Sequence, residues 1–234
     1  MKKNSNVFLT PIVHDFSFFP SGIRSYCVYY DRKYYQDHFF TDYSIDFPEE
    51  IKNSVIKRRA EFFAGRLCAN KAMNFLGVLN KQVAISPTRA PLWPDGLMGS
   101  ISHTGNYAIA IVASVDKVSL IGVDMEMRHP EVFLCISDQF TSAQERFFLQ
   151  KKEIPYDLAL LITFSAKESL YKALWPEVNS FFDFSAAEII NIDNHNQAFQ
   201  LKLTNSLTKK FQSGAVFSGK YYIIEETIIT IIAN

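Results

Sequence analysis

The chain contains 234 residues, of which 48% are apolar and 15% aromatic, and its 24 basic side chains balance 24 acidic ones. This composition excludes an intrinsically disordered chain, because disordered segments lack aromatic residues and carry a high net charge. It also argues against a protein that coats nucleic acid, which needs an excess of lysine and arginine to neutralise phosphates. We therefore expect a globular protein with no nucleic-acid partner.

The cysteine pattern and the apolar runs indicate a cytoplasmic protein. Cys27, Cys68 and Cys135 are far apart and fit neither a disulfide framework nor a structural zinc site, so we expect a reducing compartment. Residues 1–6 begin no continuous apolar stretch of the kind found in signal peptides. Apolar runs such as 108–115 are too short to span a bilayer as a helix, so we expect no membrane partner.

Hydrophobic periodicity predicts a strand, a helix and a hairpin in the first half of the chain. Residues 25–30 have β propensity, and a long amphipathic helix with a basic face follows over 48–76. Residues 99–103 and 107–115 then form two strands around a turn that contains Gly105.

The second half repeats this combination of helix and strands. Its predicted elements are a strand within 117–126, a helix from a capping box at 141–144 to about 151, a helix over 155–174 that ends at Pro176, and antiparallel strands within 188–192, 199–203 and 221–232. No low-complexity linker separates the halves, so we expect two tightly packed lobes, 1–117 and 118–234.

Two acids close the predicted strand at 117–126. Because side chains alternate along a strand, Asp124 and Glu126 project from one face while Val123 and Met125 point into the core. Paired carboxylates suit a hard cation such as Mg²⁺. The alternative is a solvated strand end that happens to carry two acids.

An acid and a base interrupt the apolar stripe of the helix at 155–174. Ser165, Glu168 and Lys172 share this stripe with leucines, and charged residues in such a place are usually paired or bound to a metal. The alternative is an ordinary surface pair at i,i+4 spacing.

Arginines give the helix at 48–76 its basic face. Arg59 and Arg66 share the apolar stripe and Arg58 lies at its edge, and the planar guanidinium suits a phosphate. The alternative is a solvated face. Ser102 and His103 end a strand where donors can meet an anion.

Taken in order, these segments resemble the 4′-phosphopantetheinyl transferases, in the branch of the surfactin-synthetase-activating enzymes and enterobactin synthetase component D. The matching segments are KRRAEFFAGR at 57–66, RAPLWP at 89–94, GSISHT at 99–104, IGVDME at 121–126 and FSAKES at 164–169, and the aromatic run at 181–184 extends the match. The first 50 residues contain no family motif.

The resemblance implies an α+β fold of two similar, pseudo-symmetric lobes, each a helix with antiparallel strands, with coenzyme A in the cleft between them. It implies a Mg²⁺-dependent transfer of the 4′-phosphopantetheine arm of coenzyme A to a serine hydroxyl of a carrier protein, with release of adenosine 3′,5′-bisphosphate. The carrier serine, rather than a residue of the enzyme, is then the nucleophile.

The resemblance also implies roles for particular residues. Asp124, Glu126 and Glu168 would bind Mg²⁺, and Glu168 would also act as general base. Lys172 would hold Glu168 and offset charge on the departing phosphate. The residues expected to bind coenzyme A are Arg58, Arg66, Arg89, Ser102, His103 and Lys167. The motif favours Arg58 as the inward arginine, whereas helical periodicity favours Arg59.

The enterobactin-like motifs favour a peptidyl or aryl carrier domain of a siderophore-type nonribosomal peptide synthetase, with a fatty-acid acyl carrier protein as the alternative. A non-catalytic module that binds coenzyme A or a nucleotide would need the basic helix and His103 but none of the acids. A nucleic-acid-binding protein that uses residues 52–71 leaves the acids unexplained, and a wholly structural role makes five ordered matches a coincidence. We expect a monomer, because one chain supplies both lobes.

Overall fold

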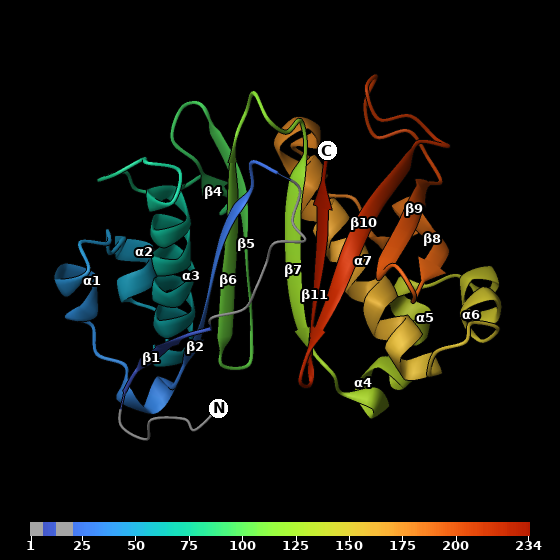
Figure 1. The fold of residues 1–234 in the computed structure, drawn as a ribbon, viewed down its shortest axis with the longest axis horizontal. Helices are drawn as coiled ribbons and strands as arrows, with labels where there is room; N and C mark the ends of the chain where they lie inside the picture. Colours follow the sequence, from blue (N-terminus) through green and yellow to red (C-terminus); the bar gives the residue numbers. More distant parts are fainter. Residues whose placement is uncertain (1–6, 13–20) are drawn as a thin grey trace. The chain divides into compact units, whose positions relative to one another are not determined.

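The computed structural model describes residues 7–12 and 21–234 and divides the chain into two compact units, residues 1–121 and 122–234. The expectation for residues 1–6 lies outside the described part. In each unit one long helix packs against an antiparallel sheet (Figure 1). This confirms the predicted α+β class.

The first unit is built around helix α3 and a four-stranded sheet with the order β1-β2-β6-β5. Its elements are β1 (Leu9–Pro11), β2 (Arg24–Tyr30), η1 (Arg32–Tyr34), α1 (Phe39–Asp42), α2 (Glu49–Lys52), α3 (Ile56–Asn74), β3 (Ala84–Ile85), β4 (Pro91–Leu92), β5 (Leu97–Thr104) and β6 (Tyr107–Ser114). β5 and β6 pair antiparallel, which confirms the predicted hairpin. α3 packs on β2, β5 and β6.

The helix predicted over 48–76 forms in two pieces, α2 and α3. The side chains of Asn53 and Ser54 bond to the backbone carbonyls of Glu49 and Glu50, and such local bonds compete with a continuing helix. Val55 is extended, with ψ of 153°, and α3 begins directly after it. The spacing of apolar residues continues across residues 53–55, so hydrophobic periodicity did not predict the break between α2 and α3.

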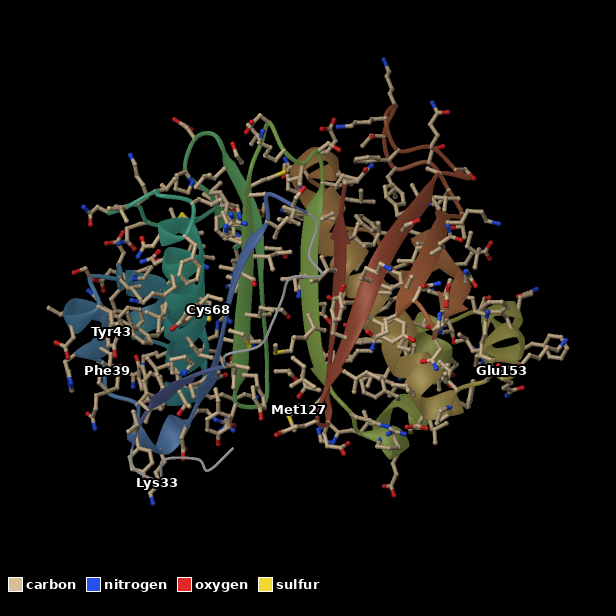
Figure 2. The ribbon with its side chains drawn as sticks, in the orientation of Figure 1. Lys33, Phe39, Tyr43, Cys68, Met127 and Glu153 are labelled. Carbon is tan, nitrogen blue, oxygen red and sulfur yellow. The ribbon has the colours of Figure 1, made fainter. Side chains whose placement is uncertain are left out.

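The aromatic residues before position 50 build the core beside α3. The rings of Phe39 and Phe40 lie 6.1 Å and 5.1 Å from that of Phe63 on α3, and Tyr43 lies 5.7 Å from it. Figure 2 labels Phe39 and Tyr43 in this cluster. These contacts give the motif-free N-terminal segment a structural role.

The second unit is built around helix α7 and a five-stranded sheet with the order β7-β11-β10-β9-β8. Its elements are β7 (Ile121–Met127), which begins at the unit boundary, α4 (Pro130–Cys135), α5 (Ser137–Phe140), α6 (Ala143–Leu149), α7 (Tyr156–Val178), η2 (Phe184–Ala186), β8 (Ala187–Asp193), β9 (Ala198–Leu203), β10 (Val216–Ile224) and β11 (Thr227–Ala233). α7 packs mainly on β11.

Two predicted boundaries in this unit were wrong. The capping box is formed by Ser142 and Glu145, one residue later than the spacing suggested. The antiparallel strands expected within 221–232 are present as a hairpin, in which β10 turns back into β11. α7 continues past Pro176 and ends where Asn179 adopts the left-handed conformation with φ of 46°.

Two further properties follow from the described residues. Within residues 7–12 and 21–234, no helix is long and apolar enough to cross a membrane. Cys27 and Cys68 are buried free thiols, and Cys135 is an exposed one.

Candidate functional site

A pocket of about 450 Å³ lies beside α3 in the first unit. Its charged lining residues are Arg58, Arg66, Arg89, His103, Glu50 and Glu61. The structure thus brings together four residues that sequence analysis assigned to coenzyme A. It adds two acids that the sequence analysis did not place there.

Arg58, and not Arg59, lines this pocket. Arg58 Nη1 lies 3.5 Å from His103 Nε2, whereas Arg59 Nη1 donates to Asp37 Oδ2 at 2.6 Å. The motif therefore identified the pocket arginine, and periodicity did not. Periodicity failed because Asp37 comes from a distant segment whose position the helix pattern does not encode.

Arg66 is a buried cation in this pocket, with 7% of its surface exposed. Its Nη2 donates to the carbonyl of Ala84 at 3.2 Å, and its guanidinium lies 4.5 Å from the Phe62 ring. Among the described residues, its Nε has no hydrogen-bond partner. Burial, together with the neighbouring Arg58, lowers the pKa of Arg66 to about 10, so it stays cationic at neutral pH. A buried donor beside a second cation favours an anionic ligand.

Arg89 reaches the pocket from a tight turn, and Ser102 does not reach it. Arg89 has φ of 66°, which is unusual for a residue with a side chain, and its N–H donates to the carbonyl of Ser86 at 2.8 Å. On β5, Ile101 and His103 line the pocket. Because side chains alternate along a strand, the buried Ser102 lies on the opposite face of β5, and its expected contact with the ligand stays a prediction.

In the second unit, Asp124 is held between two donors. Asp124 is only 3% exposed, which excludes a solvated strand end. Lys172 Nζ donates to Oδ1 at 2.6 Å, and Ser165 Oγ donates to Oδ2 at 2.8 Å. Lys172 was expected to hold Glu168, and its ion pair here is with Asp124. One ammonium and one hydroxyl thus fix the orientation of this acid.

A glycine lets β7 approach α7 this closely. A Cβ on Gly122 would lie 2.1 Å from the backbone oxygen of Ser169. Gly122 and Asp124 are two residues apart and therefore face the same side of the strand. The close approach at Gly122 is what brings Asp124 within reach of Ser165.

Glu168 is partly buried and electrostatically coupled to Asp124. Burial raises the pKa of Glu168, Asp124 raises it further, and Lys172 opposes both effects. Glu168 also raises the pKa of Tyr171, next to burial. Asp124, Glu168 and Lys172 are therefore electrostatically coupled where β7 packs against α7.

Lys167 has a different role from the expected phosphate contact. It is 4% exposed, and its ammonium donates to the carbonyls of Phe140 and Phe184 at 2.8 Å and 3.1 Å. It also pairs with Glu145 at 2.9 Å. Burial lowers the pKa of Lys167 and Glu145 opposes this shift. Lys167 thus ties α5, α6 and the chain before β8 to α7.

The fit of this site to a metal ion rests on its donor chemistry. In the described part of the chain, no group of three or more histidines, cysteines or acids is arranged to hold a metal. Mg²⁺, however, is commonly bound through one or two carboxylates together with substrate phosphates. Asp124 lies close enough to Glu168 to raise its pKa, and a cation here would offset that repulsion. The residues present therefore fit a divalent cation.

An apolar pocket of about 220 Å³ adjoins Glu168. Its aromatic lining residues are Tyr171, Phe181, Phe182 and Phe184. The Tyr171 ring lies 4.8 Å from that of Phe182, and Phe181 is 79% exposed. No predicted role falls on these side chains, although the aromatic run at 181–184 is visible in the sequence.

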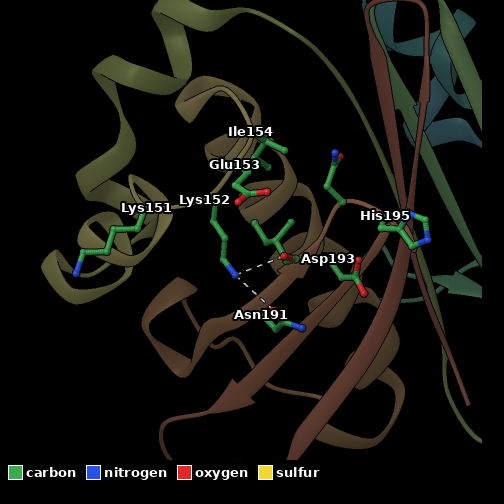
Figure 3. A pocket seen from close by; sticks show the side chains of 9 residues that line it. Lys151, Lys152, Glu153, Ile154, Asn191, Asp193 and His195 are labelled. Atoms are coloured by element: carbon green, nitrogen blue, oxygen red, sulfur yellow. Dashed lines mark hydrogen bonds between the residues drawn. The ribbon is translucent and has the colours of Figure 1, made fainter.

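A polar pocket of about 650 Å³ lies elsewhere in the second unit, between the segment at 151–154 and the turn at 191–195. Lys152 Nζ donates to Asn191 Oδ1 and to the carbonyl of Ile192, each at 3.4 Å (Figure 3). Charges of both signs line it, and none of the expected site residues does.

Comparison with known proteins finds one family for both units. Residues 47–113 match the 4′-phosphopantetheinyl transferase N-terminal domain, and residues 120–231 match the 4′-phosphopantetheinyl transferase superfamily. Enterobactin synthase component D of Salmonella typhi is 34% identical over 74% of this chain and 71% of its own. A 4′-phosphopantetheinyl transferase of Nocardia iowensis is 30% identical over 81% of this chain and 92% of its own. Another of Mycobacterium tuberculosis is 36% identical over 61% and 63%.

Proposed function

Because this chain belongs to the 4′-phosphopantetheinyl transferase superfamily, we propose that it moves the phosphopantetheine arm of coenzyme A to a serine of a carrier protein with the help of Mg²⁺. The observation that carries the proposal is the pairing of two site types in one chain. One unit has a pocket with a buried, incompletely paired arginine, and the other has a fixed acid beside a second acid and a lysine.

The pocket of about 450 Å³ beside α3 would bind the 3′-phosphate and adenine side of coenzyme A. Arg58, Arg66 and Arg89 supply donors for the phosphate, and His103 lies beside Arg58. Glu61 is suited to accept from the adenine amino group or a ribose hydroxyl, because a carboxylate is an acceptor. Lys167 and Ser102 are not part of this proposal.

Asp124, Glu168 and Lys172 in the second unit would catalyse the transfer of the arm. The carrier serine oxygen attacks the phosphorus that bears the arm, the bond to the bridging oxygen breaks, and adenosine 3′,5′-bisphosphate leaves. Glu168 takes the serine proton, because its carboxylate borders the apolar pocket that we assign to the arm. Lys172 offsets charge near the departing phosphate. Asp124 and Glu168, together with Glu126 two residues further along β7, would hold Mg²⁺, and the ion would supply positive charge for the pyrophosphate.

The apolar pocket beside Glu168 would bind the arm itself. The arm is a chain of alkyl and amide groups, and the aromatic side chains of Tyr171 and Phe182 offer a matching surface. Its position next to Glu168 would keep the arm beside the acid that receives the serine proton.

The experiment is intact-mass spectrometry of apo carrier proteins incubated with this protein and coenzyme A, with Mg²⁺ or with EDTA. We expect the mass of one arm to be added only with Mg²⁺. Glu168→Gln, which keeps the shape of the side chain, is the matched control and should give no addition. If coenzyme A binds but no carrier gains mass, the chain is a binding module and the transfer proposal is wrong.

The carrier class is tested in the same assay. Similarity to enterobactin synthase component D makes a peptidyl or aryl carrier domain of a siderophore synthetase the proposed partner. We expect kcat/KM to be higher for such a domain than for a fatty-acid acyl carrier protein. The reverse order would assign the protein to fatty-acid metabolism.

We further propose that the protein acts as a monomer in the cytoplasm. One chain supplies both site types, and its three cysteines are free. Light scattering should give one copy of the 26.8 kDa chain, and a mass of twice that value would contradict the monomer.

A further inference from the structure

Three hydroxyl side chains form a buried network behind Asp124. Ser165 and Ser169 lie on α7, Thr230 lies on β11, and all three are 0% exposed. Thr230 Oγ1 lies 2.8 Å from Ser165 Oγ and 2.6 Å from Ser169 Oγ. Ser165 Oγ in turn donates to Asp124 Oδ2. The network thus connects a residue of β11 to the acid on β7.

Counting protons gives this network a direction. A carboxylate that pairs with a lysine accepts only, so the single proton of Ser165 Oγ goes to Asp124. Any hydrogen bond between Thr230 Oγ1 and Ser165 Oγ is therefore donated by Thr230. Thr230 has a single hydroxyl proton, and both acceptors within its reach, Ser165 Oγ and the Ser165 carbonyl oxygen at 2.8 Å, belong to Ser165. The single hydroxyl proton of Ser169 in turn lies between Thr230 Oγ1 and the Thr230 carbonyl oxygen at 3.0 Å.

Packing alone does not explain a threonine at this position. Thr230 stands in the run Thr-Ile-Ile-Thr-Ile-Ile, and its isoleucine neighbours Ile229 and Ile231 are 0% and 3% exposed. A valine would fill the same volume without bringing a polar group into the core. Burying a hydroxyl costs free energy unless it is hydrogen-bonded. The hydrogen bonds of Thr230, and not its shape, therefore distinguish threonine from valine at this position.

We propose that Thr230 is a positioning residue for the cation site: it orients Ser165, and Ser165 holds one oxygen of Asp124 while Lys172 holds the other. With both oxygens held, the Asp124 carboxylate cannot rotate away from the cation. Residues that bond to metal ligands in this way typically change metal affinity when they are mutated. The inference rests on the proposed function, because it assumes that Asp124 binds Mg²⁺.

The test is Thr230→Val, which removes the hydroxyl and keeps the shape. Mn²⁺ is the probe, and its affinity is measured by electron paramagnetic resonance with saturating coenzyme A and no carrier protein. We expect about tenfold weaker Mn²⁺ binding. Coenzyme A binding in EDTA should be unchanged. Thr230→Ser keeps the hydroxyl and should retain the Mn²⁺ affinity of the unaltered protein.

Two controls separate positioning from a general loss of structure. Thr227→Val makes the same change in the same strand, at a position that is 6% exposed, and should leave Mn²⁺ affinity unchanged. Thr163→Val does so on α7, where the hydroxyl bonds only within its own helix, to the carbonyl of Ala159. Thermal melting of each variant shows which of them are folded.

A double-mutant cycle tests whether Thr230 acts through Ser165. Ser165→Ala should weaken Mn²⁺ binding at least as much as Thr230→Val. Adding Thr230→Val to Ser165→Ala should then have little further effect, because the intermediary is already gone. Fully additive losses would show that Thr230 acts independently of Ser165, and would overturn the proposal.

The remaining outcomes separate this inference from the proposed function. If the unaltered protein and folded Thr230→Val bind Mn²⁺ equally, the positioning role is wrong and the transfer proposal stands. If Thr230→Val does not fold, Thr230→Ser and Ser165→Ala carry the test, and an unchanged affinity in Ser165→Ala overturns the role. If the unaltered protein binds no Mn²⁺ and transfers the arm in EDTA, the metal assignment and this inference both fail.

Discussion

Arg66 and Asp124 are buried charges, one in each unit, but their surroundings differ. Arg66 Nε has no hydrogen-bond partner among the described residues, and the charged neighbour that lowers its pKa, Arg58, is also positive. Asp124 has Lys172 on one oxygen and Ser165 on the other. The buried cation of the first unit therefore favours an anionic ligand, whereas the buried acid of the second unit is held in a fixed orientation. We propose that the first environment binds coenzyme A and that the second carries out the transfer.

The largest effect should come from Glu168, the proposed general base. Glu168→Gln removes the carboxylate that we propose as general base and metal ligand, so we expect kcat to fall by a factor on the order of 10³ or more. Stopped assays of arm transfer measure this loss, and coenzyme A binding in EDTA should persist. A variant with kcat near that of the unaltered protein would remove Glu168 from the mechanism.

Lys167 tests whether buried charge in the second unit is structural. Lys167→Met leaves Glu145 buried without its cation, so we expect a loss of about 3–5 kcal/mol in the free energy of unfolding. Urea denaturation measures it. Coenzyme A affinity of the folded fraction should not change, and a selective loss of that affinity would restore the phosphate contact predicted from sequence.

Gly122 and Gly65 lie where a sheet and a helix meet in the second and the first unit, and they allow the packing of the two units to be compared. A Cβ on Gly122 would strike backbone atoms of α7, whereas one on Gly65 would lie 2.9 Å from the side-chain methyl of Ile101. A side chain can shift and a helix backbone cannot, so Gly122→Ala should cost about 3 kcal/mol and Gly65→Ala about 1 kcal/mol. Thermal melts of both variants measure the difference. Equal losses would mean that the two contacts are equally adaptable.

A smaller effect than that of Gly122→Ala should come from the proposed coenzyme A pocket beside α3. Arg66→Gln removes a charge-assisted contact, and we expect coenzyme A to bind about tenfold more weakly, which corresponds to about 1.4 kcal/mol. Calorimetry measures the affinity. Arg59→Gln is the matched control, because Arg59 pairs with Asp37 outside the pocket, and it should bind as the unaltered protein does.

The sequence determined the α+β class and the hairpin at 99–115, and its motifs contain the four basic residues that line the pocket beside α3. These features depend on local periodicity and on short motifs, which a single chain displays directly. The motif at 57–66 even selected Arg58 correctly over Arg59. The aromatic run at 181–184 was visible, but its place beside Glu168 was not.

Only the tertiary structure decided which partners the charged side chains have. Lys167 and Glu168 are neighbours in sequence, yet one is enclosed by two carbonyls and Glu145 while the other lies beside Asp124. Thr230 reaches Asp124 through Ser165 across more than a hundred positions of the chain. Hydrogen bonds and ion pairs act over a few ångströms of space, and chain distance does not encode which groups meet there.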